Sequence, residues 1–317
     1  MRKILLLVLI TILLVSTSLV SAQDGGLDED EQAILDRLLE LTEVVDNYES
    51  FVIDYAHYST SSQDMDLGIF AISSSEVLDV TITATVIRQP EVNISATIEA
   101  TVERFEDDIT SVYTVQAEAI YIADVLYLNI LDVASVDGAV APDFETGWQI
   151  ADEFHPFYTD LALDDFGSAV LVEEEDDDEQ QEIIDVFNEA ATSITLEGSE
   201  IGGVAVDVIT VTVGFEGILA VMGEEFESDD PQQIALMDMM FGMLSEQGDL
   251  VNYSIAIDEN DNIIGIATEI TFNLDGIDLS SLDASLENAT MTMLMEIIDV
   301  AEFSQINESF DPVEAPE

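Results

Sequence analysis

The sequence predicts an α+β fold in which a curved antiparallel β-sheet is covered by helices on its concave face. Two observations lead to this fold class. Long segments alternate apolar and polar residues and are joined by short turns, which is typical of antiparallel strands with one buried face. These segments cluster before and after a helical middle region, whereas an α/β fold alternates strands and helices one by one. A sheet this long curls, and the apolar helices are expected to cover its concave side.

The first expected element is an amphipathic helix over residues 31–47. Its apolar residues recur at intervals of three and four, which places them on one helical face; they are Ile34, Leu35, Leu38, Leu39, Leu41 and Val45. Asn47 and Tyr48 end this helix, and residues 51–56 are expected to form the first strand.

Five further strands are expected in the first half of the chain. The alternation is clearest over 77–87, VLDVTITATVI, where every second residue is apolar. The short turns between the segments favour antiparallel neighbours. The five predicted strands cover residues 77–87, 92–102, 109–122, 125–131 and 148–150.

The second half mixes helices with strands. An acidic run over 173–182 is interpreted as a solvated segment. Helices are expected over 182–191, 215–226 and 231–248, and a hairpin with strands 193–197 and 204–213 turns within 198–203. Three closing strands are expected over 250–257, 263–274 and 288–304.

The N-terminus has the pattern of a signal peptide over residues 1–22. Arg2 and Lys3 precede an apolar run over 4–20, and Val20-Ser21-Ala22 is a small-residue cleavage site. An uncleaved anchor is the alternative, because the run approaches the roughly 17 residues that span a bilayer. Residues 23–30 are interpreted as an acidic disordered leader, 31–310 as a single domain and 311–317 as a tail. We therefore expect an exported protein, located outside the cell or in the cell envelope.

The charge balance is strongly acidic. After loss of the signal peptide, three arginines face 69 acidic residues, a formal balance of −66. Such self-repulsion opposes a compact state unless ions screen it. We therefore hypothesise a salt-adapted protein that depends on cations for screening. Nucleic acid and anionic membrane surfaces are not expected as partners, whereas an uncharged apolar ligand is compatible with this charge. The chain has no cysteine, which excludes disulfides and thiol catalysis.

Methionine is concentrated in two segments. Seven of the nine methionines after the signal peptide lie in the expected helix 231–248 and in ATMTMLMEI over 289–297. Met291, Met293 and Met295 alternate along one face of a predicted strand, which makes that face a partner for the helix. Methionine is soft and unbranched, and it is over-used where a surface fits several apolar ligands. A loosely packed core is the commoner meaning of this pattern, and a ligand cavity is the alternative.

Other candidate chemistry is weak. Residues 258–269 match most of a calcium-loop pattern, but Ile263 stands where that loop needs glycine, so a hairpin turn is the preferred interpretation. His57 and His155 have no zinc spacing, and no nucleophile or phosphate-binding motif is present. Carboxylate pairs are expected by chance among 69 acidic residues. Glycosylation sequons occur at Asn93, Asn252, Asn288 and Asn307.

Three places in the chain resemble the LolA/LppX/LprG-like family of exported lipid and lipoprotein carriers. They are YIADVLYL over 121–128 with GWQI over 147–150, the segments 253–258 and 263–272, and FSQIN over 303–307 with Pro312, Val313 and Pro316. The resemblance implies a half-barrel with helices in its mouth and an apolar cavity for acyl chains. It supplies no catalytic residues. Many members carry a lipid on a cysteine after the signal peptide, and this chain lacks one.

The first functional hypothesis is therefore a non-enzymatic carrier, secreted or in the cell envelope, that binds an apolar ligand such as lipid acyl chains between sheet and helices. No cofactor and no metal site are expected. The alternatives are a cell-surface structural or adhesion module with a filled core and, third, an acid/base hydrolase. The residues expected to line the cavity are Met237, Met240, Phe241, Leu244, Met291, Met293 and Met295, with Trp148 near its rim.

Overall fold

A computed structural model describes the strands, most of their turns and parts of two helical segments. The described residues are 47–66, 71–88, 92–106, 109–123, 125–136, 142, 144–151, 157, 161, 191–214, 249–278 and 289–316, together with scattered positions of 31–44.

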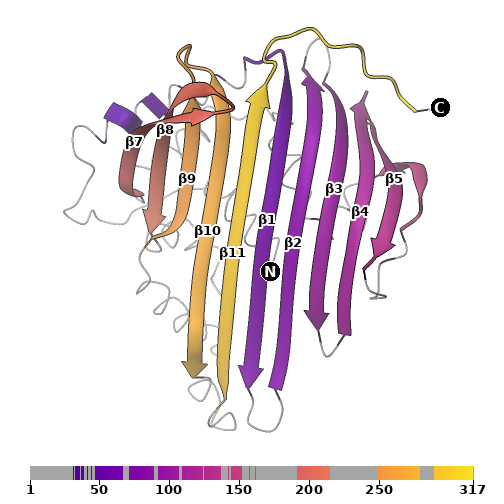
Figure 1. Cartoon of the computed structure of the whole chain (residues 1–317), viewed down its shortest axis with the longest axis vertical. Helices are drawn as coiled ribbons and strands as arrows, with labels where there is room; N and C mark the ends of the chain where they lie inside the picture. The colour runs from indigo at the N-terminus through magenta and orange to yellow at the C-terminus, as the bar shows by residue number, and fades with distance from the viewer. Residues whose placement is uncertain are drawn as a thin grey trace, which may run out of the picture.

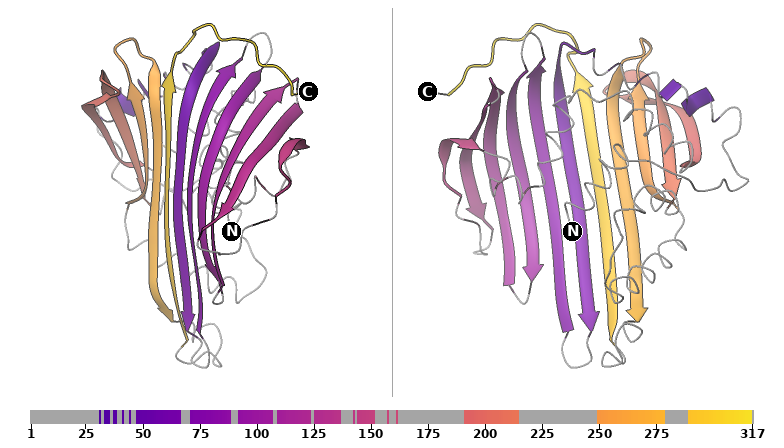
Figure 2. Two further views of the ribbon diagram at one scale, coloured as in Figure 1. Left: turned by 45° about the vertical axis from the view of Figure 1, so that its right-hand side comes forward. Right: turned by 180° about the vertical axis from the view of Figure 1, so that it is seen from behind.

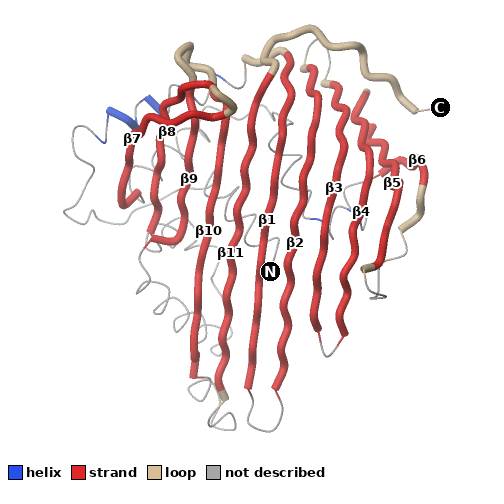
Figure 3. Tube along the Cα trace, viewed as in Figure 1, coloured by secondary structure: helices blue, strands red, loops and turns tan. Residues whose placement is uncertain are grey.

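The described part of the chain is dominated by one antiparallel sheet of eleven strands (Figures 1 and 3). The strand order is β6-β5-β4-β3-β2-β1-β11-β10-β9-β8-β7, and every neighbouring pair is antiparallel. The strands are β1 (Ser50–Asp66), β2 (Ala71–Ile87), β3 (Asn93–Glu106), β4 (Ile109–Ile122), β5 (Val125–Ser135), β6 (Gly147–Ala151), β7 (Ala191–Ile201), β8 (Val204–Gly214), β9 (Asp249–Ile257), β10 (Ile263–Asp278) and β11 (Thr290–Ser304). The sheet is open and twisted, and its outer strands bend away from the central ones (Figure 2).

Two meanders meet at the centre of this sheet. The first runs outward from β1 to β6, and the second starts at the opposite edge with β7 and returns inward to β11. The first and last strands therefore pair along their whole length, from Val52 opposite Ser304 to Asp66 opposite Thr290. This pairing makes the two halves of the chain one continuous sheet, and it places residues from both ends of the sequence side by side (Figure 1).

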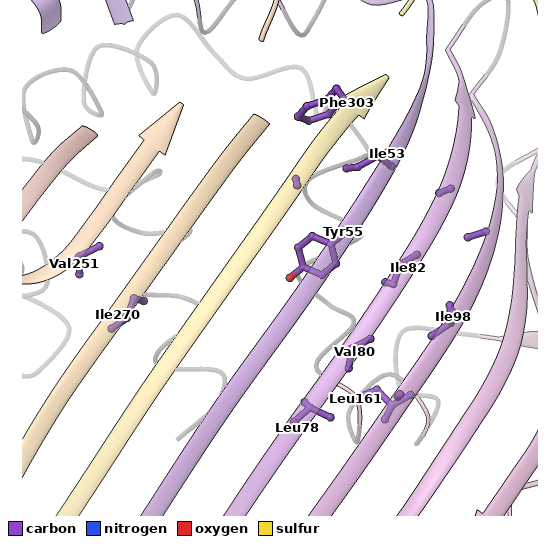
Figure 4. Close-up of a cluster of buried hydrophobic side chains, with 14 of the residues drawn as sticks. Ile53, Tyr55, Leu78, Val80, Ile82, Ile98, Leu161, Val251, Ile270 and Phe303 are labelled. Atoms are coloured by element: carbon purple, nitrogen blue, oxygen red, sulfur yellow. The ribbon is translucent and has the colours of Figure 1, made fainter. Parts of the chain in front are cut away.

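Alternation of residue type gives the sheet one buried face, which we call the core face. Consecutive strand residues point to opposite sides, so the apolar residues of each alternating segment share one side. Figure 4 shows these side chains rising from neighbouring strands on the same side. Buried members from six strands include Ile53, Val80, Ile98, Val251, Ile270 and Phe303, and Leu161 from outside the sheet packs with them. The expected curved antiparallel sheet is confirmed.

The predicted N-terminal helix is confirmed at its described positions between 31 and 44. Leu35, Leu38 and Leu41 are buried in the core, as their three-residue spacing requires. On its outer side, the Arg37 guanidinium contacts the carboxylates of Asp207 in β8 and Asp261 in the β9–β10 turn, each at 3.2 Å. The helix is therefore fixed over the β8–β10 side of the sheet (Figure 2).

An aromatic cluster closes one end of the β1–β11 pair. The rings of Tyr48, Phe51 and Phe303 meet edge to face, with centroids 5.5 to 6.5 Å apart. The Arg88 guanidinium carbon lies 5.0 Å from the centroid of the Phe51 ring. The Tyr48 hydroxyl donates a hydrogen bond to the carbonyl of Ile263, 3.0 Å away, and so links this cluster to the start of β10.

Several predicted elements lie outside the described residues. They are the signal peptide over 1–22, the leader over 23–30, the helices over 215–226 and 231–248, and the predicted helix over 182–191 except Ala191, which begins β7. The described helical residues are positions of 31–44, Phe157 and Leu161, and they do not show the predicted helical cover of the concave face. Within the described residues, no helix combines the length and the apolar character needed to cross a membrane.

Candidate ligand-binding face

Strand register places the three methionines of β11 together on the core face. Met291, Met293 and Met295 alternate with outward residues, and they share their face with Ala301 and Phe303 of the same strand. Met295 lies opposite Phe272, Met293 opposite Leu274 and Met291 opposite Ile277 of β10. The predicted methionine face is thus an apolar surface built jointly by β10 and β11.

Burial is uneven along β10 and β11: Leu274, Ile277 and Met291 are buried, whereas other apolar residues of this surface are partly exposed. Phe51 and Ile53 have no exposed surface at the aromatic end. Toward the other end Met293, Ile297 and Phe272 are only partly buried, although they pack against the core. The apolar surface along β10 and β11 therefore remains accessible in part. Met65 of β1 and Met295 of β11 are partly buried in the same way.

The other predicted lining residues do not join this surface within the described chain. Met237, Met240, Phe241 and Leu244 lie outside the described residues. Trp148 lies opposite Asn129, whereas the buried residues of β5 are its neighbours Leu128 and Ile130. Trp148 therefore points to the other side of the sheet, at the edge strand, and is 40% exposed. The structure brings together Met291, Met293 and Met295 but not Trp148.

A polar group that the sequence analysis missed interrupts the core face near its centre. Tyr55 and His57 of β1 continue the inward alternation of Phe51 and Ile53, and Asp299 lies directly opposite His57 on β11. Asp299 Oδ1 accepts hydrogen bonds from the Tyr55 hydroxyl at 2.6 Å and from His57 Nδ1 at 2.7 Å. We call these three residues the Tyr–His–Asp group. The signal in the sequence was the spacing of Phe51, Ile53 and Tyr55 at every second position of FVIDYAHY, which puts His57 on the same side.

Hydrogen bonding fixes the chemistry of the histidine. An ionised carboxylate offers only acceptors, so His57 must donate its Nδ1–H to Asp299. In the neutral imidazole, Nε2 then carries a free lone pair. His57 is 5% exposed, Nε2 is buried, and no hydrogen-bond partner for it exists among the described residues. Thr268 of β10, also buried, lies opposite Asp299 on its other side.

The candidate calcium loop is a hairpin turn, as the sequence analysis preferred. Asp258 Oδ1 accepts hydrogen bonds from the backbone N–H groups of Asn260 at 2.8 Å and of Asn262 at 2.9 Å, and Asp261 has a positive φ of 60°. Burial opposes ionisation of Asp258, but the hydrogen bonds from Asn262 and Asn260 outweigh it and hold its pKa below the ordinary value. The carboxylate of Asp258 is thus occupied in holding the turn.

The opposite face of the sheet is polar and acidic. A shallow depression there is lined by Asp79, Glu99 and Asp132 together with threonines of β2, β3 and β4. Among the described residues, no group of three or more acidic or histidine side chains is placed to hold a metal ion. Among the described residues, the continuous apolar surface therefore lies on the core face, and the opposite face is mainly polar.

Comparisons with known proteins return structures but no sequence matches. No protein-family model and no curated protein sequence matches the chain. The crystal structure of LprF from Mycobacterium bovis is matched over 92% of this chain and 99% of that one, with 15% identity and a TM-score of 0.34. The structure of the Mycobacterium tuberculosis lipoprotein LppX is matched over 88% and 98%, with 12% identity and a TM-score of 0.31. A DUF1329 family protein from Desulfovibrio piger is matched over 90% and 96%, with 11% identity and a TM-score of 0.17.

The family that the sequence resembles takes part of its name from LppX. The structural comparison thus returns a member of that family.

Proposed function

We propose that the protein is an exported, non-enzymatic carrier that holds an apolar ligand, such as lipid acyl chains, against the core face of its sheet. The observation that carries this proposal is the partly buried apolar surface along β10 and β11. Met293, Ile297 and Phe272 lie there on one face and are not fully covered. Apolar chains gain about 0.8 kcal/mol for each methylene that leaves water, so such a surface needs no specific polar contact to bind them.

The remaining parts of the proposal extend beyond the described residues. We place the helix over 231–248 across this surface, with Met237, Met240, Phe241 and Leu244 facing the methionines of β11. The apolar run and cleavage site at the N-terminus support export to the cell envelope or the medium. The soft side chains of methionine suit a site that accepts several related chains.

Mass spectrometry of protein purified from its own host in high salt tests the proposal. We expect a stoichiometric apolar molecule, seen in native spectra and recovered in an organic extract. The protein should also take up a long-chain lipid from solution after it has been stripped. A clean mass without ligand, combined with no uptake, would favour the alternative of a surface module with a filled core.

A matched pair of variants locates the site. Met293→Gln with Met295→Gln places two amides on the apolar surface, and we expect uptake to fall at least about tenfold because unpaired amides are costly there. Leu294→Gln is the control, since Leu294 lies between them on the opposite face and is 38% exposed. Equal uptake by the double variant and the control would move the ligand away from β11.

A further inference from the structure

The Tyr–His–Asp group is unusual because it lies within the apolar face. His57 sits between buried neighbours, with Tyr55 beside it on β1 and Val80 opposite it on β2. Its Nδ1–H donates a hydrogen bond to Asp299, which also accepts a hydrogen bond from the Tyr55 hydroxyl. Two short hydrogen bonds to one carboxylate oxygen hold the imidazole ring in a fixed orientation.

The second ring nitrogen of His57, Nε2, remains available for a further hydrogen bond. Buried polar atoms in native proteins nearly always have a hydrogen-bond partner, and each exception needs an explanation. His57 Nε2 is buried without a partner among the described residues. Because the Nδ1–H donates to Asp299, Nε2 of the neutral imidazole presents a hydrogen-bond acceptor on the same face as the methionines.

We propose that His57 Nε2 accepts a hydrogen bond from a hydroxyl group of the bound ligand, so that the ligand is a neutral long-chain lipid carrying an alcohol. This inference rests on the proposed carrier function and names its ligand class. Asp299 and Tyr55 are positioning residues, because they orient the imidazole and do not contact the ligand.

Charge favours an alcohol over an acid. An anionic headgroup at Nε2 would need a protonated imidazole, and it would lie close to the Asp299 carboxylate. The whole chain carries 69 acidic residues against five basic ones, which adds to the repulsion of an anion. A hydroxyl donates to the neutral imidazole without adding charge.

The spacing along β11 suits a long chain. Asp299 and Met291 are eight residues apart on one strand, which corresponds to about 26 Å. Met295 and Met293 lie between them on the same face. A ligand with its hydroxyl at His57 can therefore lay its chain along the whole methionine surface.

Competition between two probes that share one hydrocarbon chain tests this inference. Stripped protein in molar salt is offered 1-hexadecanol and its methyl ether, and the occupancy of each is measured by native mass spectrometry. We expect the wild-type protein to prefer the alcohol by about five- to tenfold, the value of one hydrogen bond. Equal binding of alcohol and ether would overturn the inference but leave the carrier function standing. Binding of neither probe would overturn both. Hexadecanoic acid is offered in a separate competition with the alcohol, and preferential binding of the acid would overturn the choice of an alcohol.

Variants at His57 separate a ligand contact from a structural role. His57→Phe removes the acceptor at similar size, and we expect it to bind the ether as before while losing the preference for the alcohol. His57→Gln retains a polar atom near the Nε2 position and should recover part of that preference. Tyr58→Phe is the control. Tyr58 follows His57 in the sequence and is 37% exposed, so this variant should keep the preference for the alcohol in full. A folded His57→Phe protein whose selectivity matches the wild type would contradict the inference, as would a folded His57→Gln protein with no more selectivity than His57→Phe.

Discussion

His57 Nδ1 lies 2.7 Å from Asp299 Oδ1, across the pairing of the first and last strands of the sheet. The two residues are 242 positions apart in the sequence, so this contact exists only when both meanders are complete. It therefore ties the two halves of the chain at the same place where it orients the free ring nitrogen toward the core face.

Asp299→Asn tests how much this contact stabilises the sheet. The variant keeps the shape of the side chain but removes the charge that strengthens both hydrogen bonds, from His57 and from Tyr55. We expect the free energy of unfolding, measured with denaturant in molar salt, to fall by about 1–3 kcal/mol. Glu302→Gln, on the exposed side of the same strand, should change it by less than about 0.5 kcal/mol. Equal effects of the two variants would show that the contact adds nothing.

The raised pKa of Tyr48 predicts that the protein loses stability at high pH. Burial raises its pKa to about 12, and the charge of Asp258 acts in the same direction, whereas a tyrosine in the unfolded chain has its ordinary pKa of about 10. Between the pKa of the unfolded chain and that of the folded protein, the unfolded chain loses a proton that the folded chain retains. The free energy of unfolding therefore falls as pH rises from 10 to 12. The contribution is no more than about 3 kcal/mol.

Tyr48→Phe isolates this contribution from other groups that titrate in the same range. It removes the hydroxyl that donates to the Ile263 carbonyl, so we expect it to be less stable than wild type at neutral pH by about 1 kcal/mol. Above pH 10 the difference should shrink and then reverse, since the variant has no phenol to ionise. A difference that stays constant from pH 8 to 12 would contradict the assignment.

The β7–β8 hairpin depends on two glycines. Gly202 and Gly203 have φ values of 56° and 85°, a left-handed conformation that matches the twist of a two-residue hairpin. Gly203→Ala should therefore lower the free energy of unfolding by about 1–2 kcal/mol. Gly198→Ala is the matched control in the same hairpin, because Gly198 has no positive φ and open space around its Cα, and its effect should be small or stabilising. Calorimetry of both variants checks the difference, which should vanish if the turn tolerates alanine.

Local alternation predicted most of the sheet. The strand over 109–122 appears with the predicted bounds, and the hairpin around 198–203 was placed correctly, although its turn narrows to Gly202 and Gly203. The second half of β1 was missed. Residues 59–64, STSSQD, have no apolar alternation, and this stretch is a strand because β2 and β11 pair with it on both sides. Such pairing is tertiary and overrides local preference.

Part of the candidate site could also be predicted from local alternation, and part could not. Met291, Met293 and Met295 could be placed on one face from alternation alone, which the structure confirms. The His57–Asp299 contact could not, because it depends on the register between β1 and β11, and a shift of one residue would turn Asp299 to the other face. Trp148 was chosen for its residue type, and its outward direction follows from its register with Asn129.

The salt dependence of stability reflects a balance between the three arginines after the signal peptide and the many acidic residues. Each is engaged: Arg37 with Asp207 and Asp261, Arg104 with Glu76, and Arg88 over the ring of Phe51. Salt weakens these attractions, but it also screens repulsion among a far larger number of acids, including Asp54 and Glu302, which face each other across β1 and β11.

Repulsion should dominate, so we expect the free energy of unfolding to rise as sodium chloride increases from about 0.1 M to 2 M. Arg37→Gln should lower it by up to about 1 kcal/mol in dilute buffer and by less in molar salt, because the ion pairs are exposed. Glu302→Gln should have the opposite sign in dilute buffer, since it relieves repulsion from Asp54, and should approach zero in molar salt. Denaturant titrations of the wild type and the two variants at both salt concentrations measure the effect of each substitution in dilute buffer and in molar salt. A wild-type protein that loses stability as salt is added would mean that its few attractive ion pairs outweigh the repulsion among its acids.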